Sequence, residues 1–248
     1  ERDVWLNNGS ETGGMKAMET KAKKKISKDN VLIFFLKNRA LLLVLIFFIL
    51  LSVATDTFLT SSNMVSLARQ IAANGIIGVG YTFLFASDSV DLSAGYMMCM
   101  IGIISGLLSQ TGMPFICILI LCAVIAVICS CFNAVIENKF NLPPFLVTLA
   151  MQQVFRGILM LLSNGSPISN LNEGIIYMGQ GYIGPIPFSV LLMLVFIVIG
   201  HIIFSRTQFG RNVIAVGGNP EAARVSGIDV NKTRVYVSAL LGFTIAIM

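Results

Sequence analysis

The sequence predicts an all-α polytopic membrane protein, a helical bundle of about seven transmembrane helices. Hydrophobic residues make up 56% of the 248 residues and charged residues only 12%, and the mean hydropathy is +0.84. Soluble domains carry about twice that charged fraction. Apolar stretches close to the roughly 20 residues that cross a bilayer fill most of the chain. Little sequence remains for a separate soluble domain.

The apolar stretches also define the expected domain organisation. Residues 1–39 form a polar, basic tail, and residues 40–248 form the transmembrane domain, which includes a cytoplasmic loop over 205–234. No cleavable signal peptide is recognisable, because the first long apolar run begins far from residue 1. The expected spans are approximately 40–55, 65–86, 92–108, 114–136, 145–162, 187–204 and 235–248.

The basic residues orient these spans. With the tail in the cytoplasm, segments 1–39, 87–91, 137–144 and 205–234 face inward and hold 15 of the 17 Lys and Arg residues. The opposite loops hold none, and the remaining two, Arg69 and Arg156, lie within spans. This is the pattern of the positive-inside rule. It predicts a multi-pass protein of the bacterial inner membrane with a cytoplasmic N-terminus, and the net charge of +5 is not a nucleic-acid signal.

Polar residues enter the spans at regular spacing. Asn74 begins a stripe of small and polar residues in the second span, and the fifth span carries Thr148, Gln152 and Arg156 with Gln153 alongside. A charged residue in mid-membrane costs about 3 kcal/mol on insertion scales and usually faces a cavity or a partner. Two interpretations stay open: this face lines a path for a polar, uncharged solute, or Arg156 is paired structurally or reaches an interface.

The loop after the second span carries Asp88 and Asp91, followed by Ser93 and Gly95. Asp91 precedes a helix and is expected to cap it by accepting from backbone N–H groups. We interpret this loop as a helix cap and gate element, with ion coupling as the weaker alternative. A metal site is not expected, because His201 is the only histidine and the five cysteines lie within apolar runs without metal-ligand spacing.

The inner loop contains a short helix with signals at both ends. Asn219 is a typical N-cap, Pro220 suits the first helical position, Glu221 complements the positive helix end, and Gly227 suits the position after the C-cap. These signals predict a helix over 220–226. A well-defined helix in an inner loop favours a docking element for a cytoplasmic partner.

Several segments resemble the ribose/xylose/galactose ABC-transporter permease family. They are 207–211, the short helix with the 228–230 segment after it, Asp91-Leu92-Ser93-Ala94-Gly95, the Asn141–Leu149 segment, and Arg156-Gly157. The segments come in the family's order and cover roughly residue 63 to the end. Each alone is weak, and their combination is specific.

The resemblance implies a permease subunit that works with partners. These are two cytoplasmic ATPase subunits that bind the ATP, an extracytoplasmic sugar-binding protein, and a second permease copy that is identical or paralogous. It implies no catalysis and no cofactor in this chain. Residues matching the family's coupling helix, which meets the ATPase, are Asn219, Pro220, Glu221, Ala222, Ala223, Arg224 and Gly227.

The sequence departs from the family in two places. The family usually has Gly-Gly-Ile before Asp-Leu-Ser, where this chain has Ser87-Asp88-Ser89-Val90. The family also continues for several helices beyond the seventh span, so a fragment or a non-transporting remnant is one expectation.

Other functions are weighed against the sugar permease. Related permeases imply furanones, nucleosides or branched-chain amino acids as alternative solutes. An intramembrane enzyme using Asp88, Asp91 or His201 is disfavoured, since enzymes need a convergent set of acid, base or metal groups. The sequence also lacks the phosphate-binding motif of ATPases.

Overall fold

The computed structural model describes residues 39–248, so the predicted basic tail lies outside the described residues. The chain forms two compact units that divide between Met64 and Val65. The division falls inside helix α3, which runs from Ser61 to Ala86. Each unit is therefore described by itself.

The first unit contains helix α2, Arg39–Ala54. Its apolar side chains are exposed on all sides, as expected of a helix whose surroundings are lipid. After the helix, Phe58 packs edge to face against Phe48 with ring centroids 5.3 Å apart. The side-chain amide of Asn63 then donates to the Phe58 carbonyl at 2.7 Å.

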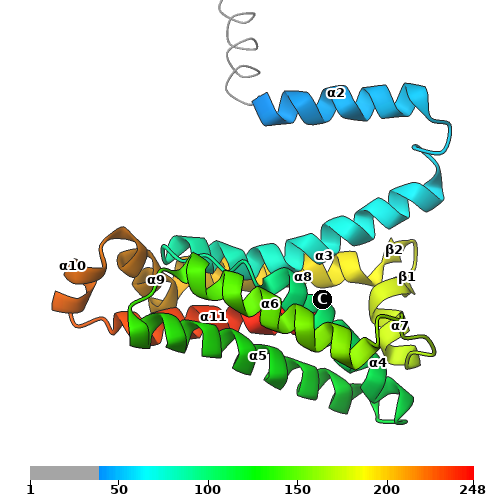
Figure 1. Cartoon of the computed structure of the whole chain (residues 1–248). Helices are drawn as coiled ribbons and strands as arrows, with labels where there is room; N and C mark the ends of the chain where they lie inside the picture. The colour runs from blue at the N-terminus through cyan, green and yellow to red at the C-terminus, as the bar shows by residue number, and fades with distance from the viewer. Residues whose placement is uncertain (1–38) are drawn as a thin grey trace, which may run out of the picture. The chain divides into compact units, whose positions relative to one another are not determined.

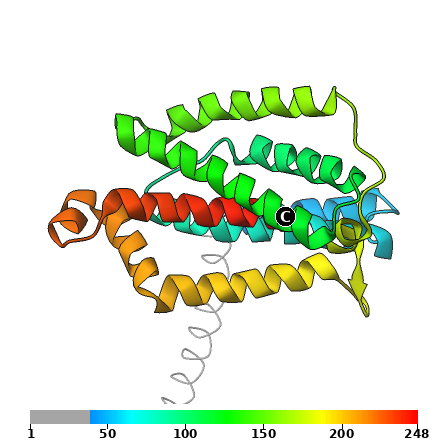
Figure 2. The same ribbon diagram turned by 90° about the horizontal axis from the view of Figure 1, so that it is seen from below.

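The second unit is a bundle of helices with short elements at its two ends. After α3 come α4 (Ala94–Gln110), α5 (Phe115–Phe140), α6 (Pro144–Ser163), α7 (Glu173–Gln180), α8 (Phe188–Arg206), α9 (Gln208–Gly218), α10 (Pro220–Val225) and α11 (Val230–Ile247). Strands β1 (Tyr182–Ile183) and β2 (Ile186–Pro187) form an antiparallel hairpin with Ile183 opposite Ile186. Helices α9 and α10 lie at one end of the bundle, and α7 with the hairpin lies at the other (Figures 1 and 2).

The all-α prediction is confirmed, and each of the seven expected spans contains a helix. Among the described residues, α5, α6 and α8 are long and apolar enough to cross a membrane, and two further apolar helices, 40–54 and α4, are shorter. The number of crossings stays a prediction. Helix α10 is present where it was expected, whereas α7 and α9 form within segments that were expected to be loops.

Helices α5 and α11 form the most extensive helix–helix packing in the described part of the chain. A Cβ atom added at Gly242 of α11 would lie 2.7 Å from the Ala126 carbonyl oxygen and 2.9 Å from the Val127 Cα of α5. Leu241 and Ile245 of α11 are buried beside this contact. Such close backbone approach is the usual means by which membrane helices associate, because lipid offers no hydrophobic drive between them.

We expect Gly242→Ala to lower the free energy of unfolding by about 1–3 kcal/mol, because the new methyl group must displace the α5 backbone. The matched control is Gly102→Ala in α4, where an added Cβ meets nothing within 4 Å. There the loss of glycine's flexibility predicts no change or a gain of up to about 1 kcal/mol. Denaturant titration in detergent micelles measures both, and equal values for the two variants would contradict the packing argument.

Candidate functional site

The short helix α10 is capped at its N-terminus by side-chain and backbone groups. The Asn219 side-chain oxygen accepts hydrogen bonds from the backbone N–H groups of Glu221 and Ala222, both at 3.0 Å. Pro220 occupies the first helical position, where its missing N–H costs nothing. The predicted N-cap is therefore confirmed.

The C-terminus of α10 is closed by a Schellman motif. Gly227 has a left-handed φ of 83°. Its N–H donates to the Arg224 carbonyl, and the Ile228 N–H donates to the Ala223 carbonyl, each at 3.0 Å. These two bonds satisfy carbonyl groups that the end of a helix leaves open. The predicted termination at Gly227 is confirmed, and a helix of six residues is held at both ends.

A small core separate from the main bundle fastens α10 to its neighbours. Val216 of α9, Ala223 of α10 and Val230 of α11 are buried together, and Ile228 packs against them. Ala223 therefore anchors the helix instead of offering its side chain to a partner. The remaining residues of α10 after its proline are exposed.

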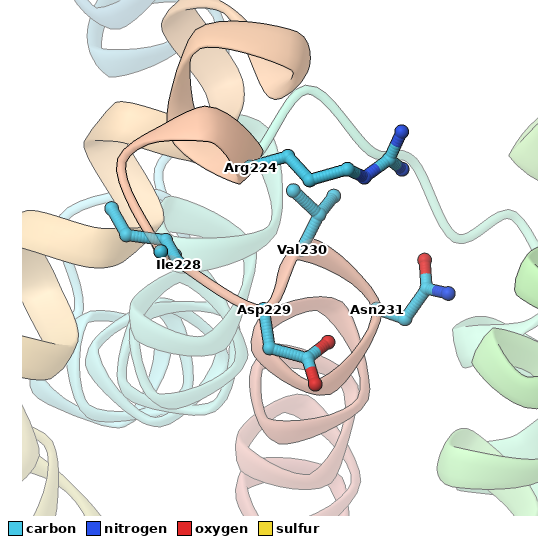
Figure 3. Close-up of a pocket in the computed structure, with 6 residues that line it drawn as sticks. Arg224, Ile228, Asp229, Val230 and Asn231 are labelled. Atoms are coloured by element: carbon cyan, nitrogen blue, oxygen red, sulfur yellow. The ribbon is translucent and has the colours of Figure 1, made fainter.

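The exposed side of α10 combines charge with one apolar side chain. Glu221 and Arg224 form a surface ion pair at 2.9 Å. Val225 is 90% exposed, which sequence reasoning missed because one valine in a six-residue helix gives no periodic signal. Between α10 and α11 lies a cavity of about 350 Å³ lined by Arg224 and by residues 227–231. Figure 3 shows Arg224 and Asn231 extending to one side of it, with Ile228 pointing the opposite way.

Asp229 begins helix α11 at the edge of this cavity. Its side chain accepts from the Lys232 backbone N–H at 3.0 Å and forms an ion pair with the Lys232 ammonium at 3.1 Å. These bonds hold the pKa of the exposed Asp229 carboxyl below its ordinary value, with the backbone hydrogen bond as the largest cause. The carboxylate stays charged at neutral pH and suits the positive end of α11.

A buried polar cluster joins α3, α4 and α5 near the same end of the bundle. One carboxylate oxygen of Asp91 accepts from the Ser93 N–H at 2.7 Å and from the Ser93 hydroxyl at 2.6 Å. The Asn133 amide donates to the Ser93 hydroxyl at 3.0 Å and to the second Asp91 oxygen at 3.5 Å. Tyr81 donates to the Asp91 main-chain carbonyl at 2.6 Å. Asp91 thus orders the entry to α4, although Ser93 itself occupies the N-cap position.

The cluster continues along α5 to α11. Glu137 lies one turn beyond Asn133, is 9% exposed, and interacts electrostatically with Asp91 and with Arg234 of α11. The Arg234 Nε and the Asn133 side-chain oxygen are buried without a hydrogen-bond partner in the described part of the chain. Sequence reasoning missed Asn133 and Glu137, because only the fold brings α5 beside Asp91. Two buried carboxyl side chains from different helices make this cluster a candidate functional site.

The end of α3 and the loop before Asp91 contact the end of α9 directly. The backbone of Gly217 at the end of α9 packs against the Ala86 carbonyl oxygen so closely that no side chain fits between them. Asp88 is exposed and has a left-handed φ of 56°. Glycine adopts that conformation without strain, and Asp and Asn tolerate it better than most residues. The departure from the family's glycines therefore falls at a position where aspartate is acceptable. Gly95, in the first turn of α4, has open space around it.

The residues predicted to line a translocation path differ in how exposed they are. Thr148 is buried and donates to the Pro144 and Phe145 carbonyls of its own helix. Gln153 and Arg156 are exposed, Gln152 is half-buried, and the Arg156 guanidinium lies 5.8 Å from the centre of the Tyr96 ring of α4. This distance is that of a cation–π contact, which gives Arg156 one structural partner on a neighbouring helix.

The polar stripe on α3 is exposed at Asn74, and farther along it faces helix α8. Gly78 and Thr82 line a cavity of about 300 Å³ together with Gly200 and His201 of α8. The Nδ1 of His201 lies 3.4 Å from the Ser205 hydroxyl. No group of three or more metal-ligating side chains occurs within residues 39–248.

Arg69 lies at the opposite end of the bundle from α10. Its guanidinium donates to the Gln180 carbonyl at 2.7 Å and lies 4.9 Å from the centre of the Tyr182 ring. Asn172 caps α7 by accepting from the Gly174 N–H at 2.9 Å, and its amide donates to the Met113 carbonyl at 3.3 Å. The 163–186 segment is thus a folded element at that end, with a helix and a hairpin.

Comparison of the sequence with known proteins places this chain among permeases. Residues 63–247 match the family model described as the permease component of the branched-chain amino acid transport system. The ribose import permease protein RbsC of Bacillus subtilis is 32% identical over 201 residues, covering 80% of this chain and 62% of that protein. The corresponding protein of Haemophilus influenzae is 29% identical over 218 residues, covering 86% of this chain and 68% of the relative.

Xylose permeases are similar over the same region. The xylose transport system permease protein XylH of Escherichia coli K12 is 27% identical over 276 residues, with 86% of this chain and 70% of the relative covered. The chain therefore spans between 62% and 70% of the length of these three relatives. No solved structure matches the chain.

We expect Asp88→Val to lower the free energy of unfolding by about 1–2 kcal/mol, because a β-branched residue is strained at this φ. Asp88→Asn is the matched control: it removes the charge, keeps the tolerance for left-handed backbone, and is expected to change stability little. Denaturant titration in detergent measures both. If Asn proves as costly as Val, the aspartate's charge and not its backbone conformation is what matters.

Proposed function

Since the chain belongs to the permease family of the branched-chain amino acid transport type, we propose that it is the transmembrane subunit of an ABC importer for a monosaccharide such as ribose or xylose. The family match over residues 63–247 supports the transport class. The names of the ribose and xylose permeases that it resembles support the choice of solute. Its relatives are named as permeases, and the energy comes from a separate ATPase that binds the ATP.

The observation that carries the proposal is the geometry of α10. A six-residue helix capped at both ends, anchored on its own small core and exposing Val225 beside a Glu221–Arg224 ion pair is built for docking. Buried apolar anchors ringed by polar groups dominate the binding energy of protein interfaces. We assign the ATPase contact to Glu221, Ala222, Arg224, Val225 and Gly227, with Asn219, Pro220 and Ala223 as the residues that hold the helix.

The Asp91 cluster is proposed as the inner gate element. Movement of α10 reaches it through two routes: the Gly217 contact with the Ala86 carbonyl, and α11, which carries Arg234. Because Asp91, Ser93 and Asn133 tie the start of α4 to α5, a shift at this end changes how the two helices meet. Gating of this kind alternates a packed bundle between two arrangements.

The translocation path is proposed along exposed polar side chains, with Asn74, Gln153 and Arg156 as members and Gln152 at its edge. Thr148 is a weaker candidate because its hydroxyl is bonded to its own helix. Amide groups suit the hydroxyls of an uncharged sugar, since each amide offers both donor and acceptor atoms.

The proposed membrane orientation follows from the charges. Helices α9 and α10 lie on the cytoplasmic side with the N-terminal tail, and α7 with the hairpin lies outside, where a sugar-binding protein docks. The basic residues of the described inner segments, including Arg206, Arg211 and Lys139, support this orientation. A second permease copy completes the assembly.

A branched-chain amino acid is the second candidate solute, favoured by the description of the matching family model. Uptake of labelled ribose, xylose and leucine into vesicles containing the permease, its ATPase and its binding protein separates the two. ATP-dependent uptake of a pentose but not of leucine is expected. Leucine uptake alone would overturn the sugar assignment, and no uptake of any solute with the ATPase and binding protein bound would overturn the transport proposal.

We expect Val225→Asp to reduce co-purification of the ATPase by about tenfold or more, because a charge replaces the exposed apolar anchor at the proposed contact. The valine is 90% exposed, so the fold is expected to be unaffected. The matched control is Ile183→Asp on the outer hairpin, an exposed apolar residue at the opposite end of the bundle. Equal ATPase retention by both variants would contradict the docking role of α10.

Replacing Glu221 or Gly227 tests coupling more finely. Glu221→Ala removes the ion pair with Arg224, and Gly227→Val strains the left-handed residue that ends α10. Both are expected to lower solute uptake per ATP hydrolysed while membrane insertion is retained. Unchanged solute uptake and ATP hydrolysis in both variants would contradict the assignment of α10 to coupling.

A further inference from the structure

A groove of about 430 Å³ runs between the end of α5 and the start of α11. It is lined by Asn138 and Lys139 of α5 and by Asn231, Lys232 and Tyr236 of α11. The Asn138 amide donates to the Asn231 carbonyl at 3.1 Å and holds the two helix ends together. The next residue on each helix is a lysine, so two cationic side chains line the same groove.

Both lysines lie on the outward stripe of their helices. On α5, the exposed residues Ile128, Phe132 and Val135 lead to Lys139 at spacings of four, three and four residues. On α11, the exposed Tyr236 lies one turn from Lys232. Residues three and four apart share one helix face. The exposed apolar stripe of α5 therefore ends in a lysine, and on α11 the exposed ring of Tyr236 shares a face with Lys232.

The charges of the groove favour an anion. Lys139 forms no ion pair within the described part of the chain, and its ammonium lies near only the Phe140 ring, 5.8 Å from the ring centre. Asp229 offsets Lys232, but that pair is exposed and therefore weak. The buried Asn138 side-chain oxygen has no hydrogen-bond partner within residues 39–248 and can accept from a hydroxyl group.

We propose that this groove binds the headgroup of an anionic phospholipid such as phosphatidylglycerol. Its phosphate lies between Lys139 and Lys232, its glycerol hydroxyls reach Asn138, and its acyl chains follow the stripe of Val135 and Phe132. Tyr236 is the aromatic residue expected at a membrane–water interface. Basic pockets between transmembrane helices recognise lipid headgroups in this way. The site depends on the bundle lying in a bilayer but not on which solute is transported.

Native mass spectrometry of the detergent-purified full chain tests the site with phosphatidylglycerol and with phosphatidylcholine of the same acyl chains. The wild type is expected to retain phosphatidylglycerol preferentially. Lys139→Gln and Lys232→Gln are each expected to weaken retention about fivefold, and Lys139→Arg to preserve it. The matched control is Arg206→Gln, which removes a positive charge from the end of α8 outside the groove and is expected to bind as the wild type does.

Four results would overturn the proposal. Equal retention of the two lipids would show that the groove does not select a headgroup with a net negative charge. Equal binding by the lysine variants and the wild type would place the lipid elsewhere. Displacement of the lipid by ammonium phosphate would assign the groove to a free anion, and loss of the ATPase from the lysine variants with lipid binding intact would assign it to a protein partner. Unchanged circular dichroism and elution volume establish that the variants are folded.

Discussion

The hydrogen bonds of Asp91 are the interactions on which the end of the bundle next to α9 and α10 depends. The residue lies at the start of α4 with its carboxylate oxygens bonded to Ser93 and within reach of the Asn133 amide of α5. Its main-chain carbonyl accepts from Tyr81 of α3. A charge at this depth is tolerated only when its hydrogen bonds are supplied by fixed partners. The carboxylate bonds to Ser93 and Asn133, and Tyr81 bonds to the main chain of the same residue, so Asp91 links α3, α4 and α5.

The fold class and the seven helical stretches could be predicted, because hydrophobic length and charge asymmetry are properties of the sequence itself. Helix α10 could also be predicted, since Asn219, Pro220 and Gly227 act within a few residues of one another. Signals of this kind act between residues close in sequence, so they do not depend on which helices become neighbours. The resemblance of the Asp91 and 207–230 segments to known permeases extended the prediction from a fold to a class of protein.

The polar cluster and the lysine groove could not be predicted, since each requires knowledge of which helices are neighbours. Asn133 and Glu137 read as ordinary polar residues near the end of an apolar run until α5 is placed beside Asp91. Thr148 gives a second case: its spacing from Gln152 and Arg156 predicted a shared polar face, and the bond of its hydroxyl to its own helix backbone could not be foreseen from that spacing. The contacts of Arg156 and of Ala223 could not be predicted for a related reason, because Tyr96 and the small core around Val216 come from other helices.

The contact between Gly217 and the Ala86 carbonyl joins the end of α9 to the end of α3, just before Asp88, through backbone atoms on both sides. No side chain mediates it, so there is no pair of residues whose sizes or charges can compensate each other during evolution. Across a family, such a contact leaves a single invariant glycine and no correlated partner. Methods that infer contacts from covarying positions would therefore miss this contact between the two segments.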